Sequence, residues 1–103
     1  MAISLADLKA EHFADLVGSV FRIVLPEHQE IFTLESVVPG PKSPDPAKYR
    51  DQFSLFFKGE SKTVLINQQI VPMETDKFGH LEIFVVPVGR NEDGSFQYQA
   101  VFA

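Results

Sequence analysis

Apolar and polar residues alternate along most of the chain after the first twenty or so positions. Successive side chains of a β-strand point to opposite faces of a sheet, so this alternation predicts strands with one buried face. The C-terminal predicted strand is the clearest, because Phe96, Tyr98 and Phe102 alternate there with polar Gln97 and Gln99. Strands are predicted over residues 19–25, 31–38, 52–58, 63–66, 69–75, 80–87 and 96–102.

The N-terminal segment follows a different period. A helical stripe is formed by residues three or four apart, namely Leu5, Leu8, His12 and Leu16. Ser4 is a suitable N-cap with Asp7 three residues later, and Gly18 is a suitable stop. The sequence therefore predicts a helix over about residues 5–16, which is too short to be stable alone and must pack on the strands.

Short polar connectors join most of the predicted strands, and no helix intervenes between them. Residues 39–50 are the exception, because four prolines within eight positions disfavour both a strand and a helix and predict a long surface loop. Consecutive strands joined by hairpins predict an antiparallel meander, and rolling it into a barrel removes its open edges. We expect one domain over residues 1–103: a mainly β (α+β) fold with one N-terminal helix packed on six or seven antiparallel strands that form a small barrel.

Composition removes several classes of function. The 103 residues include ten Phe but no Cys, which excludes disulfides, thiolate metal sites and a cysteine nucleophile. The net charge of −5 argues against a nucleic-acid-binding protein, which needs clustered positive charge. The sequence begins without the features of a signal peptide and holds no apolar run of about 18 residues. We therefore expect a cytoplasmic protein that binds neither nucleic acid nor a membrane.

Candidate catalytic and metal-binding patterns are weak. His12, His28 and His80 lie far apart and form no ligand pair of metal-site spacing, so no metal and no cofactor is predicted. No serine lies in a Gly-x-Ser-x-Gly motif, and paired acids such as Glu92 and Asp93 fall in a polar turn rather than in a cleft. The sequence predicts no catalytic residue. A hydrolase or isomerase that uses His80 or His12 remains an alternative, and it would need a cleft with convergent polar groups.

Three apolar residues stand on the face opposite the predicted core, namely Phe56, Phe84 and Val86. Two interpretations are open: either the N-terminal helix covers them, or they form an exposed patch that contacts another chain. Their position favours a non-enzymatic structural or protein-interaction module that assembles with itself, as a homodimer, or with a larger partner. The alternative is a small-molecule-binding barrel whose aromatic inner face lines a pocket, although barrels of this size are usually filled by their own side chains.

The C-terminal hairpin also carries a family resemblance. The segment F-V-V-P-V-G-R (84–90), followed by Y-Q-A-V-F (98–102), resembles the end of a small bacterial family catalogued only as a domain of unknown function. Residues 13–21 and 53–59 resemble two other segments of that family in the same order, and Ile66-Asn67 departs from its pattern, which has Leu-Pro there. The resemblance covers nearly the whole chain. It implies a fold and an association of such genes with neighbouring phage-tail-like genes, and it supplies no catalytic residue.

Overall fold

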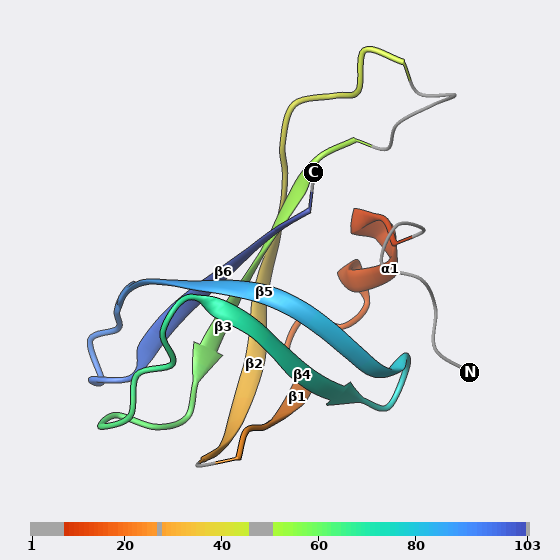
Figure 1. Ribbon diagram of the computed structural model, residues 1–103. Helices are drawn as coiled ribbons and strands as arrows, with labels where there is room; N and C mark the ends of the chain where they lie inside the picture. The colour runs from red at the N-terminus through yellow and green to blue at the C-terminus, as the bar shows by residue number, and fades with distance from the viewer. Residues whose placement is uncertain (1–7, 27, 46–50, 103) are drawn as a thin grey trace.

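The computed structural model describes residues 8–26, 28–45 and 51–102, and this part of the chain forms one short helix and a closed six-stranded antiparallel barrel (Figure 1). The helix is α1 (Ala10–Ala14). The strands are β1 (Val20–Val24), β2 (Gln29–Pro39), β3 (Phe53–Gly59), β4 (Gln69–Thr75), β5 (Gly79–Arg90) and β6 (Phe96–Phe102). The expected mainly β fold, with its N-terminal helix and small barrel, is confirmed.

The order of the strands around the barrel is β1-β2-β3-β6-β5-β4, and β4 returns to pair with β1. Two three-stranded meanders, β1–β3 and β4–β6, are therefore joined side by side, and the order differs from that of a single continuous meander. The seam between β1 and β4 is short, with Arg22 opposite Glu74 and Ile23 opposite Met73. The closed ladder leaves few free strand edges, which are the usual sites of unwanted strand pairing.

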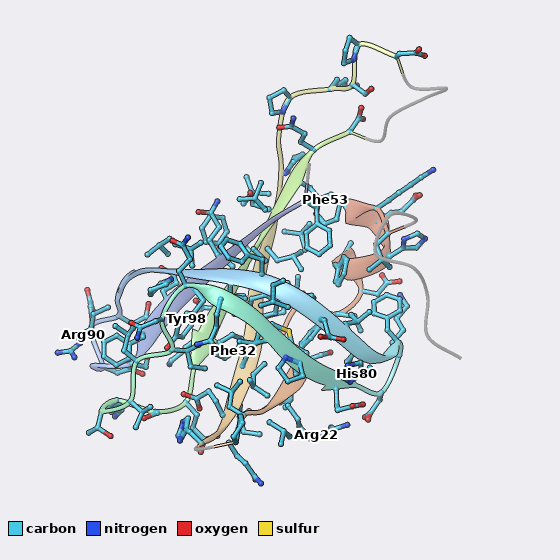
Figure 2. The ribbon with its side chains drawn as sticks, in the orientation of Figure 1. Arg22, Phe32, Phe53, His80, Arg90 and Tyr98 are labelled. Atoms are coloured by element: carbon cyan, nitrogen blue, oxygen red, sulfur yellow. The ribbon has the colours of Figure 1, made fainter. Side chains whose placement is uncertain are left out.

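The alternation of residue types decides which side chains fill the barrel. Buried and exposed positions alternate along β1, β3, β4 and β5, as the period-two pattern requires. Tyr98 is fully buried in the core and stacks on Phe32 with 4.6 Å between ring centroids, and the two residues are labelled close together in Figure 2. Burial raises the pKa of the Tyr98 hydroxyl, which accepts a hydrogen bond from the Ile66 N–H at 3.0 Å.

The helix is shorter than predicted. It begins at Ala10 rather than near residue 5, because Lys9 is extended (φ −126°, ψ 163°) and acts as the N-cap residue, with its N–H donating to His12 Nδ1 at 2.9 Å. The predicted cap at Ser4 lies outside the described residues. Leu8 is buried in the core, so its match to the helical period reflects packing rather than helical structure. Phe13 is the buried residue of α1, which lies over one end of the barrel (Figure 1).

The predicted strand over residues 63–66 does not form. The Ser61 hydroxyl accepts the N–H groups of Thr63 (3.3 Å) and Val64 (3.0 Å), and the Ile66 N–H is bonded to Tyr98. These backbone donors are therefore satisfied by side chains and join no ladder. The segment instead connects β3 to β4, and buried Ile66 belongs to the core.

Beyond the ends of β2 and β3 the chain continues as a paired arm (Figure 1). In this arm the Gly40 N–H donates to the Gln52 carbonyl at 2.8 Å and the Gln52 N–H donates to the Pro41 carbonyl at 3.3 Å. The expected surface loop follows this arm, although its residues 46–50 lie outside the described part. In the described residues no helix has the length and apolar character needed to cross a membrane.

Candidate interaction face

The three apolar residues predicted to lie opposite the core are placed on adjacent strands of the barrel wall. Gln99 on β6 has Phe56 of β3 directly opposite on one side and Val86 of β5 directly opposite on the other. Phe84 lies two residues before Val86 on the same strand, and Ile70 of β4 lies opposite Phe84. The fold therefore brings the predicted residues into one region of the outer wall.

Further apolar side chains extend this region. Val101 lies two residues beyond Gln99 on β6, opposite Ser54, and Ser54 in turn lies opposite Val38 of β2. Ile70 and Val101 are more than 60% exposed, and Phe84 is 47% exposed. We name this region the outer apolar face, defined by Val38, Phe56, Ile70, Phe84, Val86 and Val101 with Gln99 among them. Phe56 and Val86 are half-buried within it.

Helix α1 does not cover the outer apolar face. Its buried residue, Phe13, packs against Phe53, Phe78 and Phe102, with ring centroids 5.4–5.8 Å apart, at the end of the barrel. The exposed fraction of Phe84 agrees with this placement. The structure therefore leaves Phe84 exposed and Phe56 and Val86 half-buried on the outer wall, away from α1.

The outer apolar face carries no ionisable side chain at any of its seven positions or at Ser54, which lies between Val101 and Val38. Charged residues border it instead. On one side, Lys58 of β3 lies opposite Gln97, whose amide donates to the Glu35 carboxylate at 3.2 Å. On the other side, the pair next to Ile70–Phe84 is Pro72–Glu82, so the border there carries the Glu82 carboxylate. An uncharged centre with a polar rim is the usual organisation of a protein-binding surface.

The Lys58 border includes a surface depression of about 290 Å³ on the outer wall. Its lining residues are Ile31, Thr33, Lys58, Gly59, Glu60, Asp93 and Ser95. Lys58 Nζ lies 2.7 Å from Asp93 Oδ2, and the Ser95 N–H and hydroxyl donate to Asp93 Oδ1 at 2.9 and 2.6 Å. Lys58, together with these Ser95 hydrogen bonds, holds the pKa of Asp93 well below its usual range. Most of the polar groups here already have partners within the protein. Their contacts hold the turn between β5 and β6 against β3.

The opposite border is a row of charged residues across three strands. Arg22, Glu74 and His80 are consecutive partners on β1, β4 and β5, and Figure 2 shows the labelled Arg22 and His80 on the same side of the barrel. His80 Nδ1 lies 2.9 Å from Glu74 Oε1, and its Nε2 lies 3.6 Å from Glu82 Oε2. The hydrogen bond to Glu74 is the main reason that the pKa of His80 is raised, and Glu82 adds to it against the opposing effect of desolvation.

We expect an NMR titration to give His80 a pKa above that of an unfolded peptide, and Glu74→Gln to lower that pKa more than Glu82→Gln does. Because the folded-state pKa is the higher one, the pair stabilises the fold fully below the unfolded value of about 6.5. This contribution is lost as the pH rises through the folded-state pKa. A His80 pKa equal to the peptide value, or one unchanged by Glu74→Gln, would contradict the assignment.

The three histidines do not converge. His12 caps the helix through Lys9, His80 lies on the outer wall, and His28 Nε2 is buried 3.9 Å from Glu30 Oε2. Glu30 is buried and accepts backbone N–H groups, so it acts as a structural acceptor. Within the described residues, no group of three or more His, Asp or Glu side chains is arranged to hold a metal ion.

Sequence reasoning identified Phe56, Phe84 and Val86, and it missed the remaining members. The signal for Ile70 and Val101 was present, since both alternate with core residues of their strands. Val38 could not be assigned in this way. A β-bulge between Leu34 and Ser36 shifts the alternation of β2 by one residue. Before the bulge the even-numbered residues point into the core, and after it Val37 does, which leaves Val38 on the outer wall.

Comparison with known proteins adds the family and no chemistry. A family model described as Domain of unknown function (DUF6916) matches residues 8–102. The searches of the curated proteins and of the solved structures found no match.

Proposed function

This chain belongs to the DUF6916 family, a domain of unknown function, and from that premise we propose that it is a non-enzymatic module that binds another protein through its outer apolar face. The observation that carries the proposal is the exposure of Ile70, Phe84 and Val101 on adjoining positions of an uncharged surface. Large apolar patches on small proteins mark interaction sites because leaving them in water is unfavourable.

The closed ladder supports binding through side chains rather than through strand addition. β3 and β6 are paired on both sides along the outer apolar face, so a partner has no free edge there to extend. Where β5 runs beyond the end of β4, it carries Pro87, which has no N–H to donate, and a bulge between Pro87 and Gly89. A partner would therefore pack on the rings and branched side chains of the wall.

The two alternative functions have less support. For a ligand-binding barrel, the ligand would have to displace fully buried Phe21, Phe32, Phe57 and Tyr98, which contact one another in the interior. For a hydrolase or isomerase, His80 would have to act from an open strand surface where both of its ring nitrogens face carboxylates. A general acid or base works best in a cleft that excludes water and tunes its pKa.

The proposal is tested by capture from an extract of the source organism with the tagged protein, with Phe84→Ser and with Val24→Ser as a matched control. Val24 is 52% exposed on β1, outside the outer apolar face. Each variant therefore replaces one exposed apolar side chain with serine, and only Phe84→Ser does so within the face. We expect at least one protein, the untagged chain included, to be retained by the wild type and by Val24→Ser and lost with Phe84→Ser. Equal capture by all three forms, with folding verified by circular dichroism, would overturn the proposal.

A further inference from the structure

The arrangement of Gln99 within the outer apolar face identifies a specific kind of partner. Gln99 lies between half-buried Phe56 and Val86, so any surface that covers these residues also covers its carboxamide. One N–H of this group donates to Ser54 Oγ at 3.2 Å. A primary amide has two N–H donors and a carbonyl acceptor, which leaves one donor and one acceptor to be satisfied.

An apolar partner would leave these two groups without hydrogen bonds, at a cost of about 1–3 kcal/mol for each buried group. A second carboxamide related by a two-fold axis satisfies both at once, because the N–H of each amide donates to the carbonyl of the other. The remaining hydrogen-bonding capacity of Gln99 is therefore self-complementary.

The absence of charge on the outer apolar face points the same way. In a two-fold interface each residue near the axis lies close to its own symmetry mate, so a charged residue there would meet a like charge. The face has no ionisable side chain, although the chain as a whole carries a net charge of −5. The charged residues Lys58, Glu35 and Glu82 lie on its borders, where solvent screens them.

We propose that a second copy of this chain covers the outer apolar face, with the two-fold axis passing near Gln99 and the two Gln99 carboxamides paired across it. The inference rests on the proposed function of this face as an interaction surface. It adds the identity of the partner and the residue that sets the alignment of the two copies. A buried polar pair of this kind fixes register in other symmetric assemblies.

Sedimentation equilibrium over a range of protein concentrations tests the proposal with Gln99→Glu and the matched control Gln29→Glu. Gln29 is exposed on β2, so both variants add the same negative charge to the chain but only one places it at the axis. We expect a wild-type dimer, an increase of at least about tenfold in its dissociation constant with Gln99→Glu, and little change with Gln29→Glu. A monomeric wild type, or equal effects of the two variants, would overturn the proposal.

The salt dependence of dimerisation and chemical cross-linking provide two independent tests of the proposed dimer. Two chains of charge −5 repel each other, so raising the ionic strength from about 0.05 to about 0.5 M is expected to tighten the dimer. The chain has no cysteine, so Gln99→Cys introduces one thiol per copy. Two paired carboxamides hold their Cα atoms farther apart than a disulfide allows, so a short thiol-reactive cross-linker should link the two copies through position 99 and not through Gln29→Cys. Dimers that weaken with salt, or that link equally well through position 29, would contradict the two-fold arrangement.

The two proposals can fail separately. If the wild type is monomeric but Phe84→Ser still loses a captured protein of a different sequence, the second copy is excluded and the proposed function stands. If neither self-association nor capture depends on Phe84 or Gln99, both proposals are overturned.

Discussion

Phe13→Ala is expected to lower the free energy of unfolding by about 3–5 kcal/mol, the range for removing a fully buried aromatic side chain. The Phe13 ring lies within 5.8 Å of the rings of Phe53, Phe78 and Phe102, measured between centroids, and is fully buried. A five-residue helix has no stability of its own in water. The substitution therefore leaves a cavity at the end of the barrel and also removes the main apolar contact that holds α1 in place.

Urea denaturation followed by far-ultraviolet circular dichroism measures this loss. Val17→Ala is the matched control, since Val17 lies in the same N-terminal region but is 50% exposed, and its effect should stay within about 0.5 kcal/mol. Phe13→Leu keeps part of the buried volume and should fall between the two. A loss below about 1 kcal/mol for Phe13→Ala would mean that the helix adds little to the stability of the barrel.

Most of the strands were predictable because period two is a direct consequence of burying one face of a sheet. The strand over 69–75 and the strand over 96–102 form with the predicted bounds. The helix and the segment 63–66 were not predictable to the same degree. Their outcomes depend on long-range contacts, namely the burial of Leu8 in the core and the bond from Ile66 to Tyr98, which no local pattern contains.

The connection between the two meanders was also beyond the sequence pattern. Hairpins favour pairing between consecutive strands, whereas β3 pairs with β6 and β1 with β4 across the barrel. This pairing places Gln99 between Phe56 and Val86, which are far apart in the sequence. The apolar character of most of the outer apolar face was therefore readable from alternation, but its assembly from residues of five strands, β2 to β6, required the closed ladder.

The turn between β5 and β6 shows the same division between local and distant causes. The Asp-Gly pair predicts left-handed backbone at both positions, and Gly94 does have a φ of 92°. Asp93 does not, since no described residue other than glycine has a positive φ. Its side chain instead accepts hydrogen bonds from Ser95 and pairs with Lys58 of β3, an interaction that the local sequence does not reveal.

Glu30 is a buried acid whose carboxylate holds the start of the connection between β3 and β4. Its side chain is 3% exposed. Oε1 accepts the Ile31 N–H at 2.8 Å, and both carboxylate oxygens receive the Ser61 N–H at 3.1–3.2 Å. The preceding N–H, that of Glu60, donates to the Ile31 carbonyl at 3.0 Å. The carboxylate therefore joins the start of β2 to the end of β3.

Glu30→Ala is expected to lower the free energy of unfolding by about 2–4 kcal/mol, because two part-buried backbone donors lose their acceptor at once. Glu30→Gln keeps one acceptor oxygen and should cost about half as much. Hydrogen exchange supplies the decisive measurement: the Ser61 amide should exchange faster in Glu30→Ala at a urea concentration where the barrel amides stay protected. Glu60→Gln, at an exposed neighbouring position, is the control and should change neither quantity. Unaltered protection of Ser61 in Glu30→Ala would show that the loop is held by its own turn at Ser61 rather than by the buried carboxylate.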